Sequence, residues 1–134
     1  RLAYEQWLNS IEAPEQLRRE AFIECPIAHP GFFARRDAML GFGYRDRGWP
    51  EDYDLVLRWI AAGKTIGIVP RPLLDWRDTP ERLSRTADRY SIDRFTACKA
   101  QHLAQGFLAE QMVDAYEALY GEVLAEASSG ESRP

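Results

Sequence analysis

Acidic side chains gather at one point of this sequence, in the twelve residues "GWPEDYDLVLRW" that begin at Gly48. Glu51, Asp52 and Asp54 all lie in this stretch. A carboxylate that is partly removed from water can act as a general base toward a nearby hydroxyl. Acidic side chains in the first turn of a helix also stabilise its positive end without any catalytic role. The residue types alone fit both a general base and a helix start.

Helical spacing separates these carboxylates from one another. Residues two positions apart on a helix point about 200° away from each other, so Asp52 and Asp54 lie on different faces. Asp52 shares its face with the apolar residues Leu55, Val56 and Trp59, which follow it at three, four and seven positions. The spacing predicts Asp52 at the top of the buried face and Asp54 turned away from it.

The histidines and cysteines do not form a metal-binding pattern. His29 and His102 lack the HxxH or HxxE spacing of a metal site, and a lone histidine is more often a hydrogen-bonded structural residue. Cys25 and Cys98 form no CxxC pair, which favours reduced core thiols over a disulfide. No serine lies in a GxSxG turn, and "GFGYRDRG" is not a phosphate-binding glycine loop.

Aromatic and basic side chains provide candidate binding groups. Trp49 and Trp76 offer flat apolar faces on which a sugar ring can stack. Arg82 and Arg85 belong to a basic loop, and grouped guanidinium groups can bind a diphosphate. The net charge of −4 argues against nucleic acid as a partner.

Helices are predicted to carry most of these residues. Apolar spacing predicts helices over 2–11, from Pro14 onward, over 36–40 and over 50–62, with Gly63 ending the last one. Residues 91–127 are predicted to form two amphipathic helices, one carrying Phe95, Cys98 and His102, and residues 128–134 a flexible tail. No apolar run reaches the roughly 20 residues of a membrane-spanning helix, and no signal peptide is predicted.

Short strands are predicted at residues 31–35 and on both sides of a break within 64–78. The predicted fold class is therefore α/β, rich in helix and with few strands. Because so few strands cannot make a sheet by themselves, the chain is expected to complete a sheet begun elsewhere in a longer protein.

The order of several motifs resembles family 2 glycosyltransferases. The segments "IAHPGFFARRDAM", "GYRD", "PEDYDLVLR" and "GKTIGIVPRPLLDWR" follow one another as in the acceptor-side half of that family's catalytic domain, across about residues 24–90. The resemblance implies a partial GT-A fold, a Rossmann-like domain for nucleoside diphosphate sugars. Residues 1–90 would be its C-terminal part and residues 91–127 an appended helical element.

The same resemblance implies an inverting transfer of a sugar from a nucleoside diphosphate sugar to an acceptor hydroxyl. The acceptor would be a glycan, a lipid-linked molecule or a small molecule. By position Asp52 matches the family's catalytic base, and Glu51, His29, Trp49 and Arg45 would line the acceptor side.

Arg82 and Arg85 would lie near the leaving diphosphate, where positive charge stabilises departure. Thr79 stands where the family often has a histidine near the metal, which puts a metal contact from this half in doubt. A divalent cation, Mn or Mg, is expected in the full-length enzyme through the missing nucleotide-binding half, and none is expected to be bound by this chain alone.

Together these inferences predict that the chain is the half of a cytoplasmic enzyme that carries the catalytic base. The enzyme could also lie peripherally at the membrane. The 134-residue chain alone is expected to be inactive. Two alternatives stay open: a carbohydrate-binding module without turnover, and a helical module whose C-terminal helices form a homodimer.

Overall fold

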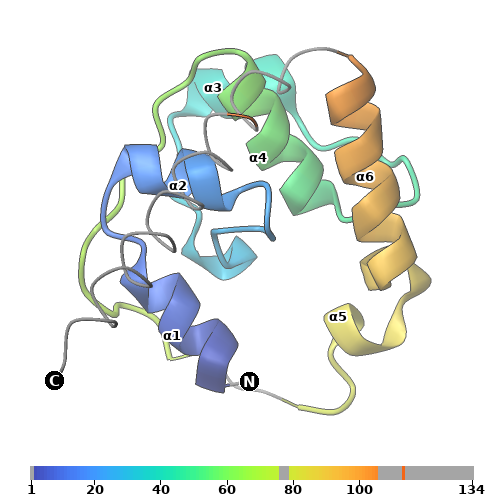
Figure 1. The fold of residues 1–134 in the computed structure, drawn as a ribbon, viewed down its shortest axis with the longest axis horizontal. Coiled ribbons are helices and arrows are strands. Elements are labelled where there is room, and N and C mark those ends of the chain that lie inside the picture. Colours follow the sequence, from blue (N-terminus) through green and yellow to red (C-terminus); the bar gives the residue numbers. More distant parts are fainter. Residues whose placement is uncertain (1, 76–78, 106–112, 114–134) are drawn as a thin grey trace, which may run out of the picture.

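The computed structural model describes residues 2–75, 79–105 and 113. In these ranges it has six α-helices: α1 Leu2–Ser10, α2 Pro14–Glu20, α3 Arg36–Phe42, α4 Glu51–Ala61, α5 Leu83–Thr86 and α6 Ile92–Ala104 (Figure 1). Two short 3-10 helices, η1 His29–Gly31 and η2 Asp88–Tyr90, join them. The helix and tail predicted beyond α6, and the homodimer contact assigned to them, lie outside the described residues apart from Val113.

The predicted α/β class is wrong, because none of the described residues forms a β-strand. After η1 the backbone is extended at Phe32 and Arg35, where strand 31–35 was expected. Residues 64–75 are irregular, although Ile66 and Ile68 are partly buried and alternate with exposed neighbours, as in a strand. A strand also needs hydrogen bonds to a neighbouring strand, and the described part of the chain offers these segments none. The GT-A sheet implied by the resemblance is therefore absent from the described residues.

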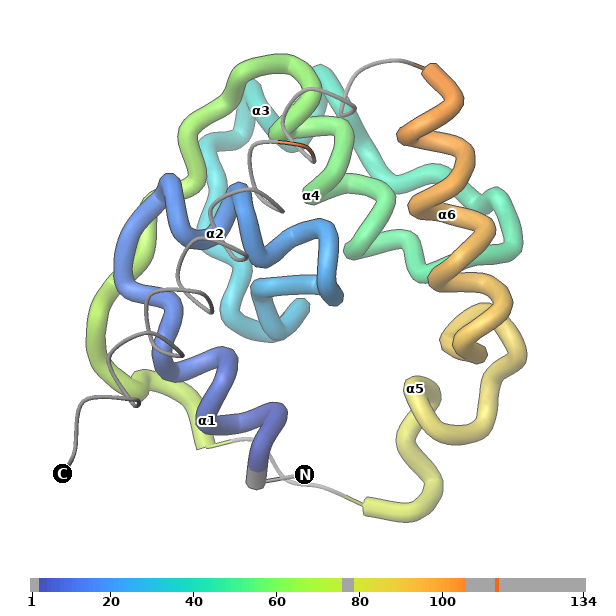
Figure 2. The backbone as a smooth tube through the Cα atoms, in the orientation of Figure 1, coloured from blue at the N-terminus to red at the C-terminus, as the bar shows by residue number. Residues whose placement is uncertain are grey.

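Helix α4 forms the centre of the core, between α6 and the side that carries α2 and α3 (Figures 1 and 2). The Tyr53 hydroxyl donates a hydrogen bond of 2.7 Å to the carbonyl of Ala21, directly after α2. Cys98 of α6 packs into the same hydrophobic cluster. The predicted apolar face is confirmed, but α4 is buried on more than one side: its buried residues are Tyr53, Asp54, Leu55, Val56, Leu57, Trp59 and Ile60.

The cysteines confirm the prediction of reduced core thiols, since Cys25 and Cys98 are both free and buried in this cluster. Within the described ranges, no helix combines the length and the apolar character that crossing a membrane requires.

Candidate functional site

Asp52 lies in the first turn of α4 with its side chain only 16% exposed. Its Oδ1 accepts a hydrogen bond of 2.8 Å from the backbone N–H of Tyr53, and its Oδ2 lies 3.9 Å from Nδ1 of His29. Burial raises the pKa of the Asp52 carboxyl, although the Tyr53 N–H and His29 act against the rise. One carboxylate oxygen is thus held by the backbone and the other faces an imidazole, in a partly dry environment suited to a general base.

His29 connects this carboxylate to two aromatic rings. Its Nε2 and the Tyr44 hydroxyl are 2.8 Å apart, and its ring lies 5.3 Å from that of Phe32 and 5.4 Å from that of Tyr44. The side chain of His29 is 41% exposed, so it borders solvent. Sequence reasoning did not single out Tyr44; its one signal is an aromatic residue in a polar, glycine-containing loop before the acidic helix.

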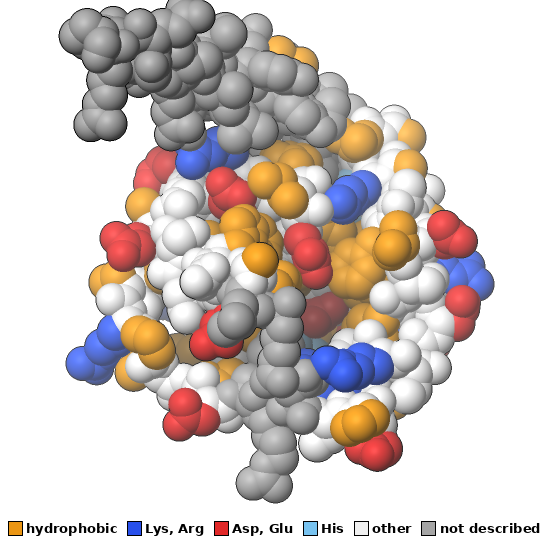
Figure 3. Space-filling model, turned by 60° about the horizontal axis from the view of Figure 1, so that its bottom comes forward, with side chains coloured by type: hydrophobic (Ala, Val, Ile, Leu, Met, Phe, Trp, Pro, Cys, Tyr) orange, Lys and Arg blue, Asp and Glu red, His pale blue; other side chains and the backbone are white. Residues whose placement is uncertain are grey.

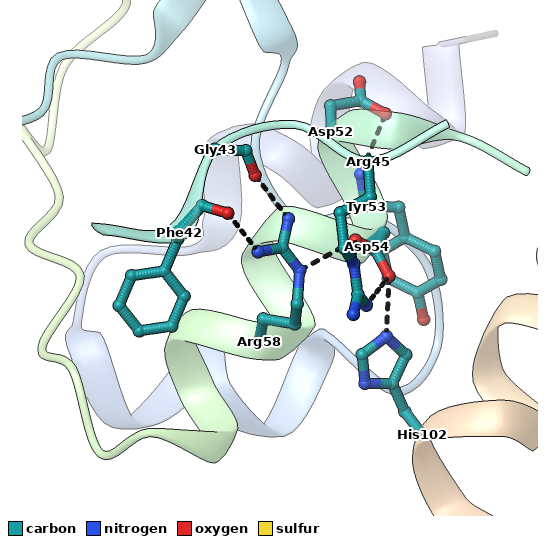
Figure 4. A network of polar contacts seen from close by, with 8 residues as sticks. All are labelled: Phe42, Gly43, Arg45, Asp52, Tyr53, Asp54, Arg58 and His102. Carbon is teal, nitrogen blue, oxygen red and sulfur yellow. Dashed lines mark hydrogen bonds and ion pairs between the residues drawn. The ribbon is translucent and has the colours of Figure 1, made fainter. Parts of the chain in front are cut away.

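Asp54 is fully buried and is the centre of a separate network (Figure 4). Its carboxylate accepts hydrogen bonds from Arg45 at 3.0 and 2.6 Å, from Arg58 at 2.8 Å and from His102 at 3.1 Å. Arg58 also donates to the backbone carbonyls at the end of α3. Burial by itself raises the pKa of Asp54, but the hydrogen bonds from His102, Arg45 and Arg58 together bring it well below its ordinary value.

This network explains why the prediction of an outward-facing Asp54 is wrong. Asp52 and Asp54 do have different surroundings on α4, as their spacing predicts. However, α6 and the loop that carries Arg45 cover the second face of α4. The structural interpretation of His102 is confirmed, because its buried ring bonds to Asp54. Arg45, expected on the acceptor side, bonds to Asp54 through its guanidinium, and its side chain is 37% exposed.

The other two acceptor-side candidates have different surroundings. Glu51 uses both carboxylate oxygens on η2: Oε1 accepts from the Tyr90 hydroxyl at 2.9 Å and Oε2 from Arg89 at 3.1 Å. Trp49 is partly buried against the hydrophobic cluster. Its indole N–H is buried and finds no hydrogen-bond acceptor among the described residues.

Arg82 and Arg85 line an open cavity of about 1480 Å³. Its apolar wall includes Ile27, Phe32, Phe33, Ile66 and Ile68. Hydrophobic side chains surround a hollow on the face shown in Figure 3, with basic side chains beside it.

Asp52 does not line this cavity, but its charge reaches a residue that does. Tyr4 is part of the cavity wall. Burial raises the pKa of the Tyr4 hydroxyl, the charge of Asp52 adds to the rise, and the charge of Arg82 opposes it. Asp52 and Arg82 therefore act in opposite directions on the pKa of the same tyrosine.

The described residues do not fit the divalent cation that the resemblance implies. The group of possible ligands that they bring together is Asp54, Cys98 and His102, all buried. Mg²⁺ and Mn²⁺ prefer oxygen ligands, and this group offers only one carboxylate. Two guanidinium groups already hold that carboxylate and would repel a cation. This cluster is a structural network.

Comparison with known proteins gives no match: no family model, no curated protein and no solved structure matches this chain. The resemblance to family 2 glycosyltransferases therefore rests on its sequence motifs alone.

Proposed function

We propose that this chain supplies the general base and the acceptor side of an inverting glycosyltransferase. The observation that carries the proposal is the environment of Asp52. Its carboxylate is mostly buried, has a raised pKa, and places Oδ2 3.9 Å from Nδ1 of His29.

In the proposed reaction, Asp52 takes the proton from the acceptor hydroxyl as that oxygen forms a bond to the anomeric carbon of the donor sugar. The bond between the anomeric carbon and the diphosphate breaks at the opposite side, so the configuration inverts. The electron pair leaves with the nucleoside diphosphate, toward the positive charges of Arg82 and Arg85 on the cavity wall. His29 and Trp49 would contact the acceptor.

The nucleotide would be bound by a half of the enzyme outside this chain, together with any divalent cation. As part of the same proposal, the reaction takes place in the cytoplasm, the compartment that the free thiols of Cys25 and Cys98 favour.

Replacing Asp52 by Asn in the full-length protein tests this assignment. We expect the rate of sugar transfer, measured with a panel of nucleoside diphosphate sugars and hydroxyl acceptors, to fall about 10²- to 10⁴-fold. In the unsubstituted protein the rate should rise with pH as Asp52 loses its proton. Because burial raises the pKa of Asp52, this rise should lie above the ordinary aspartate value of about 3.9.

Asp93→Asn is the matched control, since Asp93 is an exposed acid in the first turn of another helix, α6. The control should keep its transfer rate. Equal rates for Asp52→Asn and the unsubstituted protein would leave Asp52 as a helix-start residue and refute the proposal.

A further inference from the structure

Residues 79–90, here called the arginine segment, carry both arginines of the cavity wall but have little packing of their own. The segment contains α5 and η2, and neither helix has a buried residue. Leu83, its largest aliphatic side chain, is 70% exposed. Burial of apolar surface therefore does not fix where this segment lies, and polar contacts must contribute most of its positioning.

Glu51 provides such contacts from the first residue of α4. Its two oxygens accept from two neighbouring residues of the segment, Arg89 at 3.1 Å and Tyr90 at 2.9 Å. Arg89 also reaches Asp46 at 3.0 Å, but that carboxylate is 80% exposed and is held weakly. Glu51 is only 23% exposed, so solvent screens its ion pair less.

The position of Glu51 links the segment to the candidate base. Glu51 and Asp52 are consecutive residues in the first turn of α4, and α4 is the central helix of the core. Asp52 faces His29, whereas Glu51 faces η2. One helix start thus holds the base on one side and the segment with Arg82 and Arg85 on the other.

We propose that Glu51 is a positioning residue, which holds the arginine segment beside the base so that Arg82 and Arg85 face the donor diphosphate. The role of Glu51 in sugar transfer rests on the proposed function. Its contact with the arginine segment is independent of that function. Each oxygen of Glu51 already accepts a hydrogen bond from the segment, which leaves fewer lone pairs for an acceptor sugar.

Hydrogen exchange of the whole chain tests the contact without any activity. In Glu51→Ala, backbone amides of the segment, such as those of Ala87 and Tyr90, should exchange about tenfold faster, because the variant loses two partly screened, charge-assisted hydrogen bonds to the segment. Arg94 in the first turn of α6 bonds to Asp88 of the segment at 2.8 Å, so the comparison uses the later turns of α6. Amides of those turns should not change, because Cys98 and His102 anchor them to the core and to Asp54.

Two further variants keep this test decisive. Asp46→Asn leaves Glu51 in place and should change exchange of the segment less than twofold, an effect that agrees with the weak exposed pair. Tyr90→Phe removes one contact without altering α4, and it decides the matter if Glu51→Ala fails to fold. Unchanged exchange in the segment, or equal acceleration in the segment and α6, would overturn the proposal.

Kinetics of the full-length protein separate this proposal from the function on which it rests. Glu51→Ala should raise the KM for the donor about tenfold and lower kcat less than Asp52→Asn does. If Glu51→Ala has an unchanged KM for the donor and a raised KM for the acceptor, Glu51 contacts the acceptor, and the positioning role is refuted. If neither the unsubstituted protein nor any variant transfers sugar, the proposed function fails. Hydrogen exchange would still show whether Glu51 holds the arginine segment.

Discussion

At the scale of single residues, two carboxylates only two positions apart have opposite environments. Burial raises the pKa of Asp52, and the half-exposed ring of His29 lies 3.9 Å from its Oδ2. Asp54 is buried more completely, but three side-chain donors lower its pKa. A carboxylate poor in donors is a better base, and one rich in donors is a structural anion. Asp52 is therefore the candidate for a chemical role, and Asp54 has a structural role.

Replacing Asp54 by Asn should destabilise the protein by about 3 kcal/mol, because Arg58 and the partly exposed Arg45 lose their buried counter-charge. The pKa of Asp54 is lowered on folding, so its stabilisation is fully present above the unfolded-state value of about 3.9 and is lost as pH falls below it. Chemical denaturation should thus show a large difference between the two proteins at pH 7 and a smaller one in acid.

Asp37→Asn is the matched control for this prediction, since Asp37 pairs with Arg35 at the surface. It should leave the free energy of unfolding unchanged within measurement. A similar, small effect for both aspartates would contradict the importance of the buried network.

At the scale of elements, α4 organises the site, and its ends follow from local sequence. Pro50 precedes its first turn, where the acidic residues lie. At its end Gly63 has φ of 67°, its N–H bonds to the carbonyl of Ile60, and the N–H of Lys64 bonds to that of Trp59. These two bonds form a Schellman motif, which requires a left-handed residue at Gly63. The predicted helix end is confirmed.

Gly63→Ala should cost about 1 kcal/mol of stability, because a side chain disfavours the left-handed conformation. Gly67→Ala is the matched control: its φ is not in that region and an added Cβ meets no atom within 4 Å. Thermal unfolding should show a lower Tm for Gly63→Ala and an unchanged or slightly higher Tm for Gly67→Ala. Equal shifts for the two variants would show that the helix end does not constrain Gly63.

At the scale of the whole molecule, one hydrophobic cluster joins residues from Ile11 to Cys98. It places both thiols in the interior, next to α4. Burial raises the pKa of Cys25, and it raises the pKa of Cys98 to about 12. The reactive thiolate is therefore scarce at neutral pH, and each sulfur is also shielded by the packed core.

Both thiols should therefore react with iodoacetamide at pH 8 at least about 100-fold more slowly in the native protein than in the urea-unfolded chain. The labelling rate should increase with urea in parallel with global unfolding, followed by circular dichroism. Fast labelling of either cysteine in native buffer would show that the core around α4 opens locally.

Much of the helical framework was predictable because its signals are local. Pro14, Pro50, Gly43 and Gly63 mark helix ends through backbone geometry that depends on a few neighbouring residues. The spacing of Leu55, Val56 and Trp59 likewise predicts a buried face, which the structure confirms. The short helix α5 was missed, since four residues carry too little periodicity to distinguish a helix from a loop.

The sequence by itself determined where the main helices before residue 105 begin, that α4 ends before Gly63, and that Leu55, Val56 and Trp59 of α4 face the core. Only the tertiary structure decided that α6 and Arg45 bury Asp54, that η2 engages Glu51, and that residues 31–35 and 64–75 lack strand partners in the described part of the chain. The physical reason is range: caps and periodicity act within a few residues, whereas burial, ion pairing and strand pairing depend on segments distant in sequence.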